Sequence, residues 1–290
     1  LAERANVEIP TDAPSTPESR REWARASAER ERERLRRVLT AADREEKLPD
    51  PAEVLNVWGI GAPVTSDTEV TAWLRGRGID PAIVEALDLA RAMPADVELP
   101  RWACSSSGRS YASAGYRLAV PMYDHRGVMR SIRWRALDGR SPKTMASSCK
   151  GLVMASPLAV ELLAKPATEG KLGSTVILEG EPDFLRVAAS DWKLEGQTPA
   201  AFGVVQGSIA REWVRRIPAG VLAIAVDDDE PGDRYAAELC TLAGYRMRSG
   251  EILAARWRAP RRGMDVGEAG GLDAGTWVFD ALTSAEGTNG

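Results

Sequence analysis

The spacing of apolar residues predicts helices in the first third of the chain. Within residues 51–95, the segments 69–75 (EVTAWLR) and 81–89 (PAIVEALDL) carry apolar residues three and four positions apart. Gly76 and Gly78 lie between these segments and favour a break in helical structure. We therefore expect a group of small helices in this part of the chain.

The period of the pattern changes in the middle of the chain. Residues 116–123 and 128–137 alternate as strands do, and the turn-forming residues 124–127 (DHRG) separate them. This pattern predicts a β-hairpin. On its second strand Arg133 and Arg135 occupy alternate positions, so both guanidinium groups are expected on one face of the hairpin.

From about residue 174 onward, short apolar runs alternate with helical segments. The predicted strands are 175–178, 200–205 and 221–226, with 245–248 as a possible further strand, and the predicted helices are 182–189, 209–216 and 234–243. Alternation of this kind predicts a mostly parallel sheet covered by helices, which is an α/β architecture.

Both ends of the chain are expected to lie outside this core. Ser15 and Glu18 form the pattern of a capping box, and a highly charged segment follows to about Lys47. Because this segment has few apolar positions, we interpret residues 1–50 as a solvated linker helix. Residues 281–290 are interpreted as a tail.

Composition narrows the class of protein. The 290 residues are 44% hydrophobic and 28% charged, and no apolar run approaches the roughly 20 residues that span a bilayer. The single histidine, His125, and three scattered cysteines provide no structural zinc site, and the lack of a disulfide framework favours the cytoplasm. The histidine is expected to serve the hairpin turn and not to bind a ligand. The chain begins with Leu1, which is consistent with a piece of a longer protein.

Charge is unevenly distributed along the chain. The net charge is -4, but residues 101–150 hold ten Lys or Arg and only two acids, Asp124 and Asp138. A basic block beside an acidic remainder is what a polymerising site requires, because cations bind phosphates and carboxylates bind metal ions.

Carboxylates follow two of the predicted strands. Glu179 and Asp183 come after the first strand, and Asp227 and Asp229 come after the strand at 221–226. Sites in α/β sheets lie beyond the carboxyl ends of the strands, so these groups are expected to meet and to require a counter-cation. Mg²⁺, or Mn²⁺ in its place, suits such oxygen ligands. Asp227 and Asp229 would point the same way if the strand continued through them.

This pair of acidic segments resembles the Toprim domain of bacterial primases, topoisomerases and some nucleases. Glu179 matches the family's glutamate, Asp183 the acid four residues on, and Asp227 and Asp229 its DxD motif. A third acidic motif is matched imperfectly by residues 263–268 (GMDVGE), in which Asp265 is the better candidate and Glu268 the weaker one. The resemblance implies metal binding by Glu179, Asp183, Asp227, Asp229 and Asp265.

The segment before these motifs resembles the primase branch of the family. Residues 116–135 follow the primase pattern R-x-x-x-P-x-x-D-x-x-G and end in an arginine, and a Pro-Lys pair follows at Pro142 and Lys143. Residues 73–79 (WLRGRGI) are similar to a further element of that family. The resemblance covers roughly residues 55–270 and implies nucleotide or nucleic-acid binding by Arg117, Arg133, Arg135 and Lys143.

The resemblance implies an α+β N-terminal subdomain followed by a Toprim domain. The division we predict is 1–50 for the linker helix, 51–165 for the basic subdomain, 166–280 for the Toprim domain and 281–290 for the tail. The implied activity is Mg²⁺-dependent synthesis of short primers on single-stranded DNA from nucleoside triphosphates, with Glu179, Asp227, Asp229 and Lys143 as catalytic residues. A zinc-binding module outside this chain and a replicative helicase are expected partners, and no membrane is involved. The departures from the family pattern favour a phage, plasmid or mobile-element setting.

Two other functions stay open from the sequence alone. A Toprim nuclease would use the same acids without the basic primase segment. A degenerate Toprim domain would bind DNA within a replication complex without catalysing a reaction, which the imperfect third motif favours. A topoisomerase would need a strand-passage domain for which the chain is too short. The sequence holds no GxxxxGK[ST] motif for a helicase.

Overall fold

The computed structural model describes residues 29, 48–146, 149–165, 172–205 and 209–278. The chain divides into two compact units, Leu1–Lys47 and Leu48–Gly290, and the fold given below is that of the second. The expected linker helix up to Lys47 lies outside the described residues except for Glu29, and so does the expected tail. Within the described part, no helix is long and apolar enough to cross a membrane.

Three helices open the second unit. They are α2 (Pro51–Ile60), α3 (Thr68–Gly76) and α4 (Pro81–Ala86), so the helices predicted at 69–75 and 81–89 are confirmed. Each begins after an aspartate, Asp50, Asp67 or Asp80, whose side chain accepts hydrogen bonds from backbone amides of the first turn. Such caps satisfy amides that have no partner inside the helix.

A four-stranded antiparallel sheet follows these helices, and its strand order is β1-β2-β3-β4. The strands are β1 (Arg91–Ala92), β2 (Leu118–Tyr123), β3 (Met129–Arg135) and β4 (Thr144–Ala146). The predicted hairpin is confirmed, since β2 pairs with β3 from Leu118 opposite Arg135 to Tyr123 opposite Met129. His125 lies in the turn between them, as expected, and Trp134 is fully buried.

The second sheet has six strands in the order β10-β9-β8-β6-β7-β5. They are β5 (Met154–Ala155), β6 (Leu172–Glu179), β7 (Ala200–Val204), β8 (Ala219–Ala225), β9 (Ile252–Arg258) and β10 (Thr276–Val278). The four central strands are parallel and the two short edge strands are antiparallel. The predicted mostly parallel sheet is confirmed.

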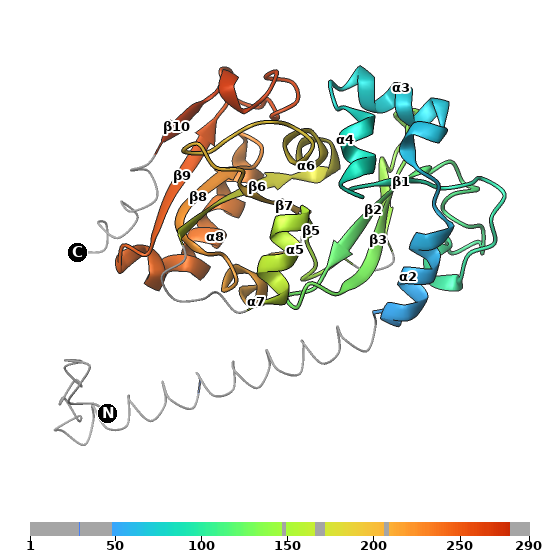
Figure 1. Ribbon diagram of the computed structural model, residues 1–290, viewed down its shortest axis with the longest axis horizontal. Helices are drawn as coiled ribbons and strands as arrows, with labels where there is room; N and C mark the ends of the chain where they lie inside the picture. Colours follow the sequence, from blue (N-terminus) through green and yellow to red (C-terminus); the bar gives the residue numbers. More distant parts are fainter. Residues whose placement is uncertain (1–28, 30–47, 147–148, 166–171, 206–208, 279–290) are drawn as a thin grey trace. The chain divides into compact units, whose positions relative to one another are not determined.

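Helices cover both faces of this sheet (Figure 1). They are α5 (Pro157–Ala164), α6 (Gly180–Ala188), α7 (Arg211–Val214) and α8 (Glu230–Arg248). Alternation along β6 places Val176 and Leu178 in one core cluster with Phe184 of α6, while Ile177 packs on the other face with Trp213 and Leu239. The expected α/β class, an antiparallel sheet followed by a helix-covered parallel one, is confirmed.

One predicted element is wrong. Residues 245–248 are not a strand; they form the last turn of α8, which continues the helical spacing of the buried Leu239 and Ala243. The helix ends before Gly250, whose φ of 73° favours glycine, and the strand begins only at Ile252. The predicted helix at 209–216 is present but shorter, as Arg211–Val214.

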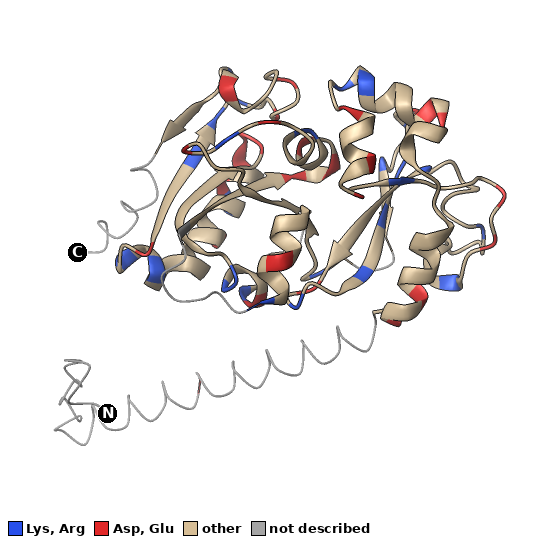
Figure 2. Ribbon diagram, in the orientation of Figure 1, with Lys and Arg blue, Asp and Glu red and all other residues tan. Residues whose placement is uncertain are grey.

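The topology brings two acidic segments together. β6 and β8 are neighbours and run parallel, with Leu178 opposite Ala225 at their carboxyl ends. The residues that follow these two positions are therefore side by side at one edge of the sheet. Acidic segments follow β6 and β8, whereas β3 of the other sheet carries basic residues (Figure 2).

Candidate active site

The first acidic segment turns sharply from strand to helix. Glu179 is the last residue of β6, and Gly180 follows it with a φ of 75°, a conformation that favours glycine. α6 begins at once and carries Asp183 in its first turn, where the carboxyl is almost fully buried. The turn thus aims two carboxylates, four residues apart, toward the same edge of the sheet.

The second acidic segment departs from the expected strand geometry. β8 ends at Ala225, so the condition under which Asp227 and Asp229 would point the same way is not met. Asp229 instead caps α8, and its side chain accepts a hydrogen bond of 2.7 Å from the amide of Gly232. Asp227 lines the cavity described below, whereas Asp229 is not among the lining residues.

The third acidic segment joins the other two. Asp265 and Glu268 line the same cavity, and the amide of Glu268 donates to the Asp265 carboxylate at 2.6 Å. The amide of Gly267 donates to Asp183 at 2.9 Å, which ties this loop to α6. A side chain at position 267 would press on the carboxylates of both Asp183 and Asp265, so the glycine allows this close approach.

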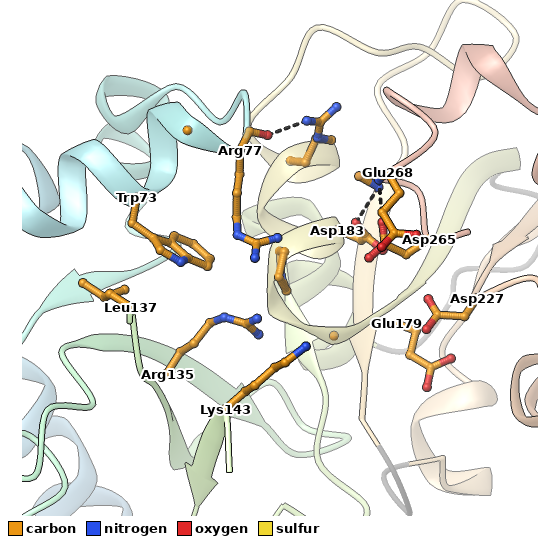
Figure 3. A pocket seen from close by; sticks show the side chains of 15 residues that line it. Trp73, Arg77, Arg135, Leu137, Lys143, Glu179, Asp183, Asp227, Asp265 and Glu268 are labelled. Atoms are coloured by element: carbon orange, nitrogen blue, oxygen red, sulfur yellow. Dashed lines mark hydrogen bonds between the residues drawn. The ribbon is translucent and has the colours of Figure 1, made fainter. Parts of the chain in front are cut away.

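These residues form one wall of a cavity of about 720 Å³, and cations form the opposite wall (Figure 3). The acidic wall comprises Glu179, Asp183, Asp227, Asp265 and Glu268. The cationic wall comprises Arg77, Arg135, Lys143 and Arg186. The first wall comes from the six-stranded sheet, and most of the second comes from α3 and the antiparallel sheet.

Burial and mutual repulsion raise the pKa values of the acidic wall. The pKa of Glu179 rises to about 7 through burial and then through the nearby Asp227 charge. The pKa of Asp183 also rises to about 7, through burial and then Asp265, and that of Asp227 to about 6 through the same two causes. Carboxyl groups with such raised pKa values are only partly ionised at neutral pH, and a bound cation would favour their ionised form.

The donor set fits a hard divalent cation. Oε2 of Glu179 is buried and accepts no hydrogen bond from the described residues. It therefore has a free lone pair beside other carboxylates, which is what Mg²⁺ requires of a ligand. Among the residues that the structure describes, no three Asp, Glu, His or Cys side chains already have an arrangement that could hold a metal ion. Binding would thus draw the separated carboxylates together.

Arg135 and Trp73 shape the cationic wall. The Trp73 ring lies 4.7 Å from the Arg77 guanidinium and 5.3 Å from that of Arg135. Burial, and then the neighbouring Arg77 and Arg133 charges, lower the pKa of Arg135 to about 10. Arg135 therefore stays charged at neutral pH, and Lys143 stands exposed on the same wall.

Arg133 and Arg135 share one face of β3 as predicted, but both guanidinium groups are already engaged by another side chain of the protein. Both form ion pairs with Glu181, the second residue of α6, whose side chain is 1% exposed. Only Arg135 lines the cavity. Arg117 lies elsewhere, paired with Asp67 and donating to the carbonyl of Met93, and it is not a lining residue.

Sequence reasoning missed several residues around the site. Trp73 and Arg77 lie in a segment that resembles a primase element, but the sequence assigns neither of them a role. Glu181 is not predicted at all, although it lies between Glu179 and Asp183. Arg256 was missed altogether, although it is fully buried on β9 and donates to the carbonyl of Asp227 at 2.7 Å. Its signal, an arginine inside an apolar run, was hidden because the strand was predicted too early.

Solved bacterial primase catalytic cores share this architecture of an antiparallel sheet joined to a mostly parallel, helix-covered sheet. The chain matches the catalytic core of Escherichia coli primase with a TM-score of 0.51 and 15% identity, over 77% of each chain. It matches the DnaG primase catalytic domain bound to single-stranded DNA with a TM-score of 0.50 and 16% identity, over 74% of this chain and 72% of that one.

A longer primase shows how much of such a protein this chain spans. The match to the Aquifex aeolicus primase, with its zinc-binding and RNA polymerase domains, has a TM-score of 0.48 and 15% identity, and covers 79% of this chain but 61% of that one. No protein-family model and no curated protein sequence matches the chain. At these identities the similarity establishes the fold.

Proposed function

We propose that this chain is the catalytic core of a DNA primase, a metal-dependent nucleotidyltransferase that makes short primers on single-stranded DNA. One observation carries the proposal. In a primase-like fold, three acidic segments far apart in sequence line one cavity whose opposite wall is cationic. A nucleoside triphosphate with its divalent ion needs both walls together, because its phosphates bind cations and its ion binds carboxylates.

The acidic wall holds the metal in this proposal. Glu179, Asp183, Asp227 and Asp265 supply the ligands, with Asp229 beside them at the start of α8. When bound, divalent ions lower the pKa of a primer 3′-hydroxyl and neutralise the departing pyrophosphate. The carboxylates orient the reacting groups, and burial keeps bulk water from competing for them.

The cationic wall binds the triphosphate and the template. Arg135 is held firmly by Glu181 and offers its remaining donors to the cavity, while Lys143 is exposed and free to reach a phosphate as a point charge. Single-stranded DNA is the proposed template. It is bound by a solved primase domain of the same fold, and two cations of the basic segment 101–150, Arg135 and Lys143, line the cavity of this chain. We further propose a cytoplasmic setting and a zinc-binding module as a partner.

The test is nucleotide incorporation on defined single-stranded templates with Mg²⁺ or Mn²⁺, with ribo- and deoxynucleotides compared. We expect labelled primers from the wild type and none from Glu179→Gln, whose melting temperature should be no lower than that of the wild type. Cleavage of the template would instead indicate a Toprim nuclease. Binding of the template without synthesis by either protein would indicate a non-catalytic DNA-binding subunit, a function that the separated carboxylates of the metal-free site also favour.

A further inference from the structure

The tripeptide Arg-Trp-Arg occurs twice, in strands of two different sheets. Arg133, Trp134 and Arg135 lie on β3, and residues 256–258 repeat the triplet on β9. Both tryptophans are fully buried in the core. Because side chains alternate along a strand, the two arginines of each triplet project together from the opposite face.

On β3 the arginine pair holds the first acidic segment. Arg133 and Arg135 both bind the carboxylate of Glu181, which Arg135 contacts at 2.6 Å. Glu181 lies two residues after Glu179 and two before Asp183, so the pair fixes the turn that carries both carboxylates of the cavity. The bond also joins the antiparallel sheet to α6.

On β9 the arginine pair holds the second acidic segment. Arg256 is fully buried and donates to the carbonyl oxygens of Val226 at 2.6 Å and of Asp227 at 2.7 Å. Arg258 donates to the carboxylates of Asp228 at 2.8 Å and Asp233 at 2.6 Å. These bonds fix the backbone on both sides of the Asp227 side chain relative to β9.

Other bonds extend this anchorage to the third acidic segment. The carbonyl of Asp228 accepts a bond of 2.8 Å from the amide of Gly263, two residues before Asp265. Asp229 accepts from the amide of Gly232, whose missing side chain allows the carbonyl of Asp227 to approach closely. The β9 arginines therefore act on a network that includes both later acidic segments.

We propose that the two Arg-Trp-Arg triplets are positioning residues that hold the separated acidic segments in register, so that they can close on a divalent ion. Arg256 and Arg258 set the position of Asp227, and Arg133 and Arg135 set that of Glu179 through Glu181. This inference rests on the proposed function for its metal, but the geometry it assigns exists without one. Buried guanidinium groups suit the task, because a planar fork directs several donors at fixed angles.

The test replaces Arg256 with lysine, which keeps the charge but loses the fork. Arg246→Lys is the matched control, since Arg246 also donates to a backbone carbonyl, that of Ile217 at 2.6 Å, and to a carboxylate, that of Glu251 at 2.7 Å. Arg246 lies at the far end of α8 and does not line the cavity. Because Arg258 is partly exposed, Arg258→Lys serves as a milder second variant if Arg256→Lys fails to fold.

Two measurements separate positioning from the proposed function. The first is amide hydrogen exchange of the metal-free protein: Gly232 and Gly263 should exchange roughly tenfold faster in Arg256→Lys, the effect of about one lost hydrogen bond, and not in Arg246→Lys. The second is calorimetric titration with Mg²⁺ alone, well below each variant's melting temperature. Arg256→Lys should weaken binding roughly tenfold to a hundredfold, as loss of a ligand-orienting contact does.

Each outcome has a definite meaning. Unchanged exchange at Gly232 and Gly263 in a folded Arg256→Lys or Arg258→Lys variant overturns the positioning role. Faster exchange with unchanged Mg²⁺ affinity also overturns it, because the loop would then move without affecting the ligands. If the wild type binds no Mg²⁺, the metal of the proposed function is wrong, and the exchange data alone decide whether the triplets position the loop.

Discussion

At the scale of single residues, the site is defined by carboxylates that are costly to ionise. Asp183 is 3% exposed, and the pKa of its carboxyl rises to about 7 because of burial and the neighbouring Asp265. The fold maintains this unfavourable arrangement in the metal-free protein by tying Asp183 to the amide of Gly267. Residues that lower stability while lining a cavity are a common feature of functional sites.

The raised pKa values predict how the stability of the metal-free protein depends on pH. The folded-state pKa of Asp183 lies above its ordinary value of 3.8, so between about pH 4 and 7 the folded state binds more protons than the unfolded state. This group's contribution therefore falls as pH rises through that window and is constant above it. Asp183→Asn removes the dependence, so the variant should gain stability relative to the wild type, on the order of a few kcal/mol, between pH 4 and 7.

Urea denaturation of both proteins in chelator at several pH values checks this difference. Taking the difference between variant and wild type removes the contribution of the acids that do not interact with Asp183. A constant difference across the window would show that Asp183 is ionised with an ordinary pKa. With Mg²⁺ present, the wild type should be stabilised more at pH 8 than at pH 5, because protons compete with the ion for the carboxylates.

At the scale of elements, buried ion pairs join strands and helices that are distant in sequence. Glu181 of α6 bridges Arg133 and Arg135 of β3, and it is the most buried of the three residues. The two arginines on this face were predicted to bind nucleotide or nucleic acid, but both form ion pairs within the protein. Arg135 serves both roles in our proposal, whereas Arg133 serves the internal one.

Removing the carboxylate that both arginines share should therefore strongly lower the stability of the protein. Glu181→Ala leaves two guanidinium groups facing each other without a counter-charge, and we expect it to cost about 3–5 kcal/mol of stability. Replacing all three residues with methionine should restore much of that loss, because no uncompensated charge remains. The control is Glu230→Ala, which removes an exposed pair with Arg234 and should cost at most about 1 kcal/mol. The denaturation midpoints of the Glu181→Ala, triple-methionine and Glu230→Ala variants measure these changes. Equal losses of stability for Glu181→Ala and Glu230→Ala would contradict the bridging role of Glu181.

One helix offers a matched pair of glycine substitutions. At Gly232, in the first turn of α8, a Cβ atom would lie 1.8 Å from the carbonyl oxygen of Asp227, so Gly232→Ala must displace the acidic loop. At Gly244 the flexible end of Arg248 is the only close neighbour among the described residues, and alanine favours the helix by up to about 1 kcal/mol. We expect Gly232→Ala to lower both stability and Mg²⁺ affinity and Gly244→Ala to raise stability alone. Thermal unfolding with and without Mg²⁺ distinguishes them, and similar behaviour of the two variants would contradict the close approach.

At the scale of the whole molecule, the described fold resembles that of a primase catalytic core. The chain covers 77% of the Escherichia coli catalytic core. The three cysteines of the present chain are free and lie on different elements. A zinc-binding module would thus have to come from outside these 290 residues.

This arrangement predicts a difference between starting and extending a primer. We expect the chain to extend a supplied dinucleotide better than it initiates synthesis. In the proposed function the cationic wall binds template phosphates, and phosphate contacts carry no sequence information. Unprimed and dinucleotide-primed synthesis on templates of defined sequence measure the difference. Addition of a zinc-binding module, in cis or in trans, should increase sequence-dependent initiation, whereas efficient sequence-specific initiation by the chain alone would show that it needs no such module.

The sequence by itself determined the architecture and the acidic wall. Apolar runs at 175–178 and 221–226 define buried strands, and parallel strands necessarily end at the same edge, so the residues after them had to meet. Glu179, Asp183 and Asp227 were predicted for this reason and line the cavity, whereas Asp229, predicted for the same reason, does not. Asp265 also lines the cavity, but it was expected only from the resemblance to Toprim proteins. The period of a strand is a local property, which is why a linear pattern contains it.

Only the tertiary structure decided which charges remain available and which are already paired. Arg135 and Glu181 are 46 residues apart, and nothing in either segment alone specifies that they meet. The same holds for Arg256, whose donors reach carbonyls 29 and 30 residues away, and for Asp229, which caps a helix because the strand ends four residues earlier. The partner of a charged side chain depends on how whole elements pack, and packing minimises the free energy of the entire chain, which no single segment encodes.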